Sequence, residues 1–147
     1  MIDIPPEKRL KTTIKSGSVY WFSEDNIKPK PHYLVVINHK PKTDENIILV
    51  KGSSQVEKVK KKKRYLSPKK TCVIVKKEEY SDFTDDTIFD CNRVYPYTQS
   101  EITQITKKPY FKFKPDMNED IVDRLRDAVY ESPCIENFIK ELLLNNH

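Results

Sequence analysis

Residues 47–55 read Ile-Ile-Leu-Val-Lys-Gly-Ser-Ser-Gln, an apolar run that turns polar within a few residues. Four consecutive apolar residues, led by an isoleucine pair that favours extended backbone, predict a strand buried in the core. Lys51 and Gly52 are expected to end this run. Because Gly52 is one of only two glycines in the chain, we expect its backbone freedom to be needed there. Such a strand would deliver two serines and an amide to the surface as a rigid polar platform.

A cationic segment follows this platform almost directly. Residues 58–64 read Lys-Val-Lys-Lys-Lys-Lys-Arg. Hydroxyl groups beside a run of cations are typical of sites for phosphate esters, because nucleic-acid backbones are bound largely through their charge. The alternative is that the run forms only a solvated face. The combination favours a nucleic-acid-binding site, most simply for RNA or DNA.

The composition is that of one soluble domain. The chain has 147 residues and a net charge of +5, with 33% charged and 37% hydrophobic residues. No apolar run reaches membrane-spanning length and no signal peptide is recognisable, so we expect a cytoplasmic protein that does not bind a membrane. The cysteines, Cys72, Cys91 and Cys134, lack the spacing of metal ligands, and we expect buried free thiols.

Short apolar stretches separated by turn signals predict a mainly β domain. Residues 56–65 are expected to form an exposed hairpin arm, since lysines occupy both of its faces. The other expected strands are residues 19–22, 33–37, 71–75 and 87–94. Short strands with few glycines indicate a small, strongly bent barrel or sandwich.

Helical spacing replaces this pattern in the last third of the chain. Residues 100–105 are expected to form a short helix, and residues 116–130 a longer one with acidic residues in its first turn. The apolar stripe of the longer helix, expected to pack in the core or a dimer, is Ile121, Val122, Leu125, Ala128 and Val129. A further helix from Pro133 would have as its apolar side Ile135, Phe138, Ile139, Leu142 and Leu143.

Four stretches carry a resemblance to a known family. They are residues 16–21 (Ser-Gly-Ser-Val-Tyr-Trp), 30–36 (Lys-Pro-His-Tyr-Leu-Val-Val), 50–55 (Val-Lys-Gly-Ser-Ser-Gln) and 87–94 (Thr-Ile-Phe-Asp-Cys-Asn-Arg-Val). In order and spacing they resemble the MazF/PemK endoribonuclease toxins of bacterial toxin–antitoxin pairs. The resemblance implies a mainly β fold with C-terminal helices, built as a small SH3-like barrel that is usually a homodimer.

The resemblance also implies how the chain divides. We expect an N-terminal arm over residues 1–14, a MazF/PemK-like barrel domain with its C-terminal helix over residues 15–131, and an appended helix over residues 132–147.

The family cleaves single-stranded RNA without a metal or cofactor, by attack of a ribose 2′-hydroxyl on the adjacent phosphate. The resemblance implies that Lys30 takes the place of the family's arginine and Ser53 that of its threonine or serine, while Arg93 supplies a further cation. It implies no metal site. The residues expected to bind RNA are Lys28, Ser54, Gln55, Lys58, Lys60, Lys61, Lys62 and Arg64.

Two positions depart from the family pattern. Where one branch of the family has an arginine and an aspartate as acid and base, this sequence has Asp90 and Asn92. His32 is expected to be a packed or half-exposed strand residue rather than a general base. Glu24 or Asp25, in the loop before it, is an alternative base.

The resemblance implies a cognate antitoxin as partner, whose acidic segment would enter the basic groove. A rival hypothesis is a non-catalytic module that binds nucleic acid or protein on the same barrel. A third is an interaction domain in which the terminal helix pairs with a partner's helix.

Overall fold

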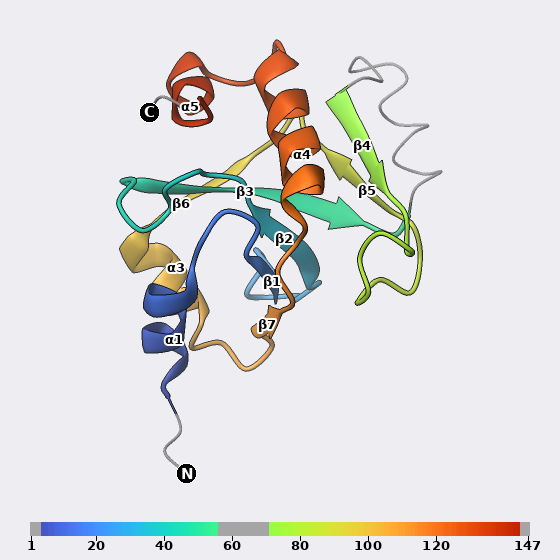
Figure 1. Ribbon diagram of the computed structural model, residues 1–147. Helices are drawn as coiled ribbons and strands as arrows, with labels where there is room; N and C mark the ends of the chain where they lie inside the picture. Colours follow the sequence, from blue (N-terminus) through green and yellow to red (C-terminus); the bar gives the residue numbers. More distant parts are fainter. Residues whose placement is uncertain (1–3, 56–70, 145–147) are drawn as a thin grey trace.

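Seven antiparallel strands form one sheet in the computed structural model, which describes residues 4–55 and 71–144 (Figure 1). The strands are β1 (Val19–Phe22), β2 (His32–Val36), β3 (Asn46–Ser53), β4 (Cys72–Val75), β5 (Thr87–Asp90), β6 (Tyr95–Thr98) and β7 (Lys112–Lys114). The helices described are α1 (Pro6–Thr13), α3 (Gln99–Ile105), α4 (Glu119–Glu131) and α5 (Asn137–Leu142). The prediction of a mainly β fold with C-terminal helices is therefore confirmed.

The sheet is open in the part of the chain that the structure describes. Its strands follow the order β4-β5-β3-β2-β1-β7, and β6 pairs with β3 beside this path. No pairing between described strands joins β4 to β7, so the sheet does not close into a barrel. The predicted hairpin arm of residues 56–65 lies outside the described residues.

Strand β3 is the centre of the sheet. It pairs with β2 along one edge, while its first half pairs with β6 and its end with β5 along the other. The strand continues to Ser53, so Lys51 and Gly52 end the apolar run, as expected, but not the strand itself. This long strand carries the polar residues to the point where β2 and β5 begin.

Both faces of β3 are buried, which explains why its apolar run does not alternate with polar residues. Ile48 and Val50 lie in one core, which α4 and α5 cover. Ile47 and Leu49 lie in a second core on the opposite face, with α1 and α3. Figure 1 shows the two pairs of helices on opposite sides of the sheet.

Gly52 is required for space and not for backbone freedom. Among the described glycines, only Gly17 has a positive φ, of 90°. A Cβ atom on Gly52 would lie 2.7 Å from Phe89 Cζ and 2.7 Å from Thr87 Cγ2, closer than such atoms can approach. The neighbouring strand β5 therefore packs its side chains directly against the backbone of β3.

The buried face of α4 was predicted correctly, whereas the start and the apolar side of α5 were predicted only in part. All five residues of the predicted stripe in α4 are buried. Ile135, Ile139 and Leu143 also lie in this core, but α5 begins only at Asn137 and Phe138 is 49% exposed, contrary to its predicted place on the apolar side. None of the described helices is long and apolar enough to cross a membrane.

The cysteines differ in their environments. Cys91 is buried, Cys72 is partly buried and Cys134 is exposed, so the prediction of three buried thiols holds only for the first. Within residues 4–55 and 71–144, no group of three or more histidine, cysteine or acidic side chains is placed to hold a metal ion.

A buried arginine ties α4 to the start of the sheet. The side chain of Arg126 is 5% exposed. Its Nη1 donates to Ser16 Oγ at 2.8 Å and to the carbonyl oxygen of Ile37 at 2.9 Å. Its Nη2 donates to Asp123 Oδ1 at 2.7 Å and to the carboxylate of Glu119. One side chain thus links the helix to two connections of the sheet.

Replacing Arg126 by methionine is expected to lower the free energy of unfolding by about 1–3 kcal/mol, because the buried carbonyl of Ile37 loses its side-chain donor. Arg124→Met is the matched control, since Arg124 pairs with Glu79 on the exposed side of the same helix and should cost less than about 1 kcal/mol. Urea denaturation measures both. Equal losses in the two variants would contradict a structural role for the buried arginine.

Candidate functional site

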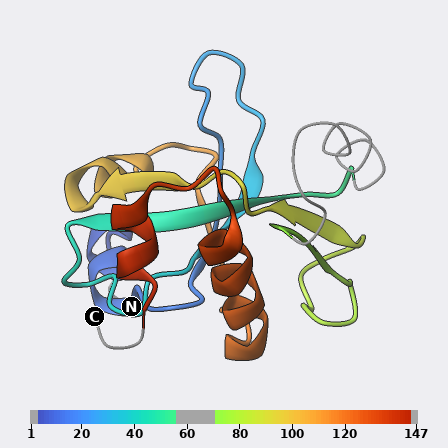
Figure 2. The same ribbon diagram turned by 90° about the horizontal axis from the view of Figure 1, so that it is seen from above.

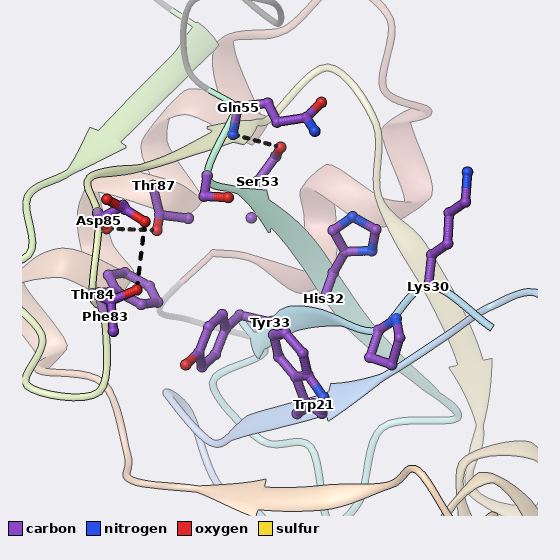
Figure 3. A pocket seen from close by; sticks show the side chains of 13 residues that line it. Trp21, Lys30, His32, Tyr33, Ser53, Gln55, Phe83, Thr84, Asp85 and Thr87 are labelled. Carbon is purple, nitrogen blue, oxygen red and sulfur yellow. Dashed lines mark hydrogen bonds between the residues drawn. The ribbon is translucent and has the colours of Figure 1, made fainter.

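A pocket of about 480 Å³ opens where β3 ends (Figure 3). Residues 52–55 line it from the end of β3, and residues 30–33 line it from the start of β2. Trp21 of β1 completes this side. The opposite wall comes from the loop before β5, with Phe83, Thr84, Asp85 and Thr87.

The register of the strands brings these distant segments together. Tyr33 lies opposite Gly52 on β3 and opposite Trp21 on β1. Ser53 lies opposite Ile88 on β5. Because neighbouring strands are antiparallel, the end of β3 meets the beginnings of both β2 and β5. The pocket is therefore a product of strand pairing and not of one continuous segment.

The pocket contains four of the residues predicted for the site, Lys30 and residues 53–55. Lys28 and Arg93 do not line it. The guanidinium of Arg93 instead lies 5.0 Å from the ring centroid of Tyr95, beyond the end of β5. The remaining predicted residues, Lys58, Lys60, Lys61, Lys62 and Arg64, lie outside the described part of the chain.

A buried serine positions Lys30. Ser23 Oγ accepts hydrogen bonds from the backbone N–H of Lys30 at 2.9 Å and of Asp25 at 3.1 Å, and donates to the carbonyl oxygen of Asp25 at 2.9 Å. Figure 2 shows the β1–β2 loop, in blue, extending away from the sheet. The serine closes the base of this loop and fixes the backbone at Lys30 where it enters the pocket.

The two acidic residues of this loop have other partners. The backbone N–H groups of Lys28 and Ile27 donate to Asp25 Oδ1 and hold the pKa of this carboxyl below its usual value. Glu24 forms an ion pair with Lys51 at 3.1 Å. Neither acidic residue lines the pocket, so the geometry does not favour either as its base.

His32 places an imidazole in the pocket. It is the first residue of β2 and is half-exposed, as predicted, but its position within the site was not predicted. Figure 3 shows its ring between Ser53 and Lys30. Partial burial, followed by the nearby ammonium of Lys51, lowers the pKa of His32 below the ordinary histidine value. The neutral form, which can accept a proton, therefore prevails at pH 7.

Aromatic rings form the floor of the pocket. The ring centroid of Tyr33 lies 4.9 Å from those of both Trp21 and Phe83, in edge-to-face geometry. The Tyr33 hydroxyl donates to Asp82 Oδ2 at 2.5 Å, and Lys114 Nζ lies 3.1 Å from the same oxygen. These contacts hold the floor rigid, and the ring of Trp21 remains partly exposed beside it. A partly exposed indole is suited to stacking on a nucleobase.

The residues that depart from the family's acid–base pair have a structural role. Asp90 Oδ1 accepts hydrogen bonds from Asn92 N at 3.1 Å and from Asn92 Nδ2 at 3.0 Å. Asn92 Oδ1 in turn accepts one from Ser132 Oγ at 2.7 Å. These bonds fasten the turn after β5 to the end of α4, and neither residue lines the pocket.

Comparison with known proteins found a match in fold but none in sequence. No protein-family model matches the sequence, and no curated protein matches it. A solved structure does match: an endoribonuclease in complex with its cognate antitoxin, from a mycobacterial species. The TM-score is 0.51 and the identity is 8%, with 80% of this chain and 91% of that chain covered. The chain is therefore similar in fold to an endoribonuclease whose structure was solved in complex with its cognate antitoxin.

Proposed function

We propose that this protein is a metal-independent endoribonuclease of the MazF/PemK type, which cleaves single-stranded RNA and is the toxin of a toxin–antitoxin pair. One observation carries the proposal: Lys30, His32 and Ser53 line one pocket, and the pKa of His32 is lowered so that its imidazole is neutral. Cleavage by a ribose 2′-hydroxyl requires a cation, a proton acceptor and a hydrogen-bond donor at one phosphate.

Each of these groups has one role in the proposed reaction. The imidazole of His32 accepts the proton of the 2′-hydroxyl, whose oxygen then bonds to the adjacent phosphorus. Lys30 stabilises the charge that develops on the phosphorane. Ser53 Oγ accepts the backbone N–H of Gln55 at 3.1 Å, which leaves its own proton free to donate to a phosphoryl oxygen. The bond to the 5′-oxygen breaks, and that oxygen takes a proton from solvent.

RNA binding would extend beyond the reacting phosphate. Ser54 and Gln55 lie at the mouth of the pocket and offer hydrogen bonds to phosphate or to base edges. Trp21 offers an aromatic face. Lys28 and the cations of residues 58–64 remain in the proposal as contacts to the RNA backbone, whose strength should fall steeply as salt is added.

The proposal is tested by incubating the purified protein with a long single-stranded RNA in EDTA, beside Lys30→Ala and Ser53→Ala. We expect cleavage at defined positions that both substitutions reduce strongly. Lys42→Ala is the control, because it removes an exposed lysine that does not line the pocket and has no place in the proposed RNA contacts. Cleavage that survives both pocket substitutions would assign the activity to a different site.

The pH profile provides a separate prediction. Because the pKa of His32 is lowered, activity should fall only when the pH drops below 6.5, the ordinary histidine value, as the base becomes protonated. The measurement is kcat/KM for a short RNA from pH 5 to pH 8. A fall in kcat/KM with its midpoint at or above pH 6.5, or a fall that persists in His32→Gln, would exclude His32 as the general base.

A cognate antitoxin and a homodimer also belong to the proposal. The mycobacterial structure of similar fold is bound to its antitoxin, which supports a partner of this kind here. An acidic, unfolded segment would be attracted to a basic site that evolved to hold phosphates. The mass of the protein in solution, measured by light scattering, tests the dimer directly.

The rival function, a non-catalytic module that binds nucleic acid, is favoured by one observation. Asp90 and Asn92 form hydrogen bonds in the turn after β5, and neither supplies an acid or a base to the pocket. Such a module would shift RNA in a gel, with strong salt dependence, and would leave it intact.

A further inference from the structure

The pocket at the end of β3 contains a carboxylate that the proposed cleavage reaction does not use. Asp85 is the only acidic residue among the described residues that line this pocket. It belongs to the loop before β5, and Figure 3 shows it across the pocket from Lys30 and His32. Because a carboxylate repels phosphate groups, its place in an RNA-binding pocket is unfavourable unless it contacts a different part of the substrate.

The oxygens of Asp85 are available to a bound molecule. The side chain is exposed, and it forms no ion pair with any residue in the ranges 4–55 and 71–144. Thr84 Oγ1 lies 3.5 Å from Asp85 Oδ2, which is at the long limit for a hydrogen bond. The carboxylate is therefore a strong acceptor without a strong donor in the described part of the chain.

The neighbouring acidic residues of the same loop differ in this respect. Asp82 Oδ2 accepts a hydrogen bond from the Tyr33 hydroxyl at 2.5 Å and forms an ion pair with Lys114. Asp86 Oδ1 accepts a hydrogen bond from the backbone N–H of Lys77 at 3.0 Å. Neither of these two carboxylates lines the pocket, and both hold the loop in place.

The backbone that carries Asp85 is well supported. Thr87 Oγ1 donates to the carbonyl oxygen of Asp85 at 3.2 Å. Two residues before Asp85, Phe83 is buried, with ring centroids of Tyr33 and Tyr80 at 4.9 and 4.5 Å. Such support positions the carboxylate before a ligand arrives, which reduces the entropy lost on binding.

Guanine is the RNA base that matches a carboxylate best. A carboxylate accepts hydrogen bonds through two oxygens and donates none. Guanine has two adjacent donors on its Watson–Crick edge, N1–H and the 2-amino group. In adenine and cytosine an acceptor nitrogen stands beside the amino group and would face a carboxylate oxygen. Uracil has a single donor between two carbonyl groups. Proteins read such edges in single-stranded RNA, where the bases are unpaired.

The pocket has room and a surface for a base beside the phosphate. Its volume of about 480 Å³ is in the range of small-molecule sites. The partly exposed ring of Trp21 offers a stacking surface on the floor. With the phosphate near Lys30 and His32, a neighbouring base would extend toward the wall that carries Asp85.

We propose that Asp85 is a specificity-determining residue, which binds the Watson–Crick edge of a guanine next to the cleaved phosphate. The inference rests on the proposed function, because it requires RNA in this pocket. It adds the base that the pocket selects and gives Asp85 no part in proton transfer.

The test measures the affinity of short single-stranded RNAs by fluorescence anisotropy. Each RNA carries one test base among uridines, and all sugars are 2′-fluoro, so that the nucleophile is absent and no RNA is cleaved. The test bases are guanine, hypoxanthine, adenine and cytosine, and hypoxanthine lacks only the 2-amino group of guanine. We expect guanine to bind at least about ten-fold more tightly than hypoxanthine, the effect of one hydrogen bond to a charged group.

Asp85→Asn keeps the shape of the side chain but turns one acceptor into an amide donor that faces guanine. We expect this variant to bind the guanine RNA at least about ten-fold less tightly and to lose the difference between guanine and hypoxanthine. An RNA of uridines alone should bind it equally or more tightly, because a negative charge is removed. These opposite directions separate base recognition from a general change in charge or folding.

Asp86→Asn is the matched control. It makes the same charge change at the next position, outside the pocket, and its remaining side-chain oxygen still accepts the N–H of Lys77. This variant should keep the full preference for guanine.

The outcomes distinguish this inference from the proposed function. Equal affinity for guanine and hypoxanthine in the unmodified protein, or a preference that survives Asp85→Asn, would overturn the inference and leave the ribonuclease proposal standing. A guanine preference that Asp85→Asn removes would support the inference even if unmodified RNA is not cleaved. Failure to bind any of the RNAs would overturn both.

Discussion

Replacing His32 by glutamine is expected to lower kcat/KM for RNA cleavage by about 10²–10⁴-fold, the usual contribution of a general base. Glutamine keeps a polar side chain of similar reach but cannot take up a proton. The imidazole lines the pocket beside Lys30 and Ser53, and its lowered pKa leaves it neutral and ready to accept the 2′-hydroxyl proton. Single-turnover cleavage of a short labelled RNA measures the chemical step.

The control is His39→Gln. His39 lies outside the pocket, where its Nε2 is 3.0 Å from the carbonyl oxygen of Leu143. It should retain nearly full activity. RNA affinity, measured separately by filter binding, should change little in His32→Gln, because the neutral imidazole adds no charge to attract the backbone. Equal rates in the two histidine variants would exclude His32 as the base.

Replacing Gly52 by valine is expected to lower the free energy of unfolding by about 1–3 kcal/mol or more, the cost of overpacking a tight core. Even the first added carbon would lie 2.7 Å from both Phe89 Cζ and Thr87 Cγ2. This steric clash can be relieved only if β5 moves away from β3. Because Thr87 lines the pocket, the shift should also reduce activity in the fraction that folds.

Ser54→Val is the matched control for this substitution. Ser54 lies two residues further along, is exposed, and receives a β-branched side chain without meeting a neighbouring strand. Urea denaturation should place its stability close to that of the unmodified protein. Comparable loss in both variants would mean that the close approach of Phe89 to β3 is not what requires glycine.

Much of the fold was predictable because local sequence patterns determine its strands and helices. The apolar run of residues 47–50 indicated a strand buried in the core, and the spacing in residues 121–129 indicated a helix with one packed face. Strands β6 and β7 were not predicted. The first contains Pro96 and the second has only three residues, so neither shows an alternating pattern, and both depend on their pairing with β3 and β1.

Site residues that follow or precede a recognisable strand in the sequence could be predicted. Site residues that only strand pairing brings to the pocket could not. Lys30 and Ser53 stand next to recognisable strands, and the structure brings them to one pocket. The wall of residues 83–87 comes from an acidic loop with no signal of its own. Arg93 was assigned by alignment with a family pattern, yet it lies over Tyr95 outside the pocket. The position of an arginine in sequence does not determine where its long side chain reaches.

In the proposed mechanism, the substrate's own 2′-hydroxyl is the nucleophile. The most direct measurement is the chemistry of the new RNA ends after cleavage in EDTA, with an otherwise identical substrate that carries a single 2′-deoxy sugar at the cleavage position. We expect a 2′,3′-cyclic phosphate or 3′-phosphate and a free 5′-hydroxyl, and no cleavage of the deoxy substrate. Products with a 5′-phosphate, or cleavage at the deoxy position, would contradict the proposed mechanism.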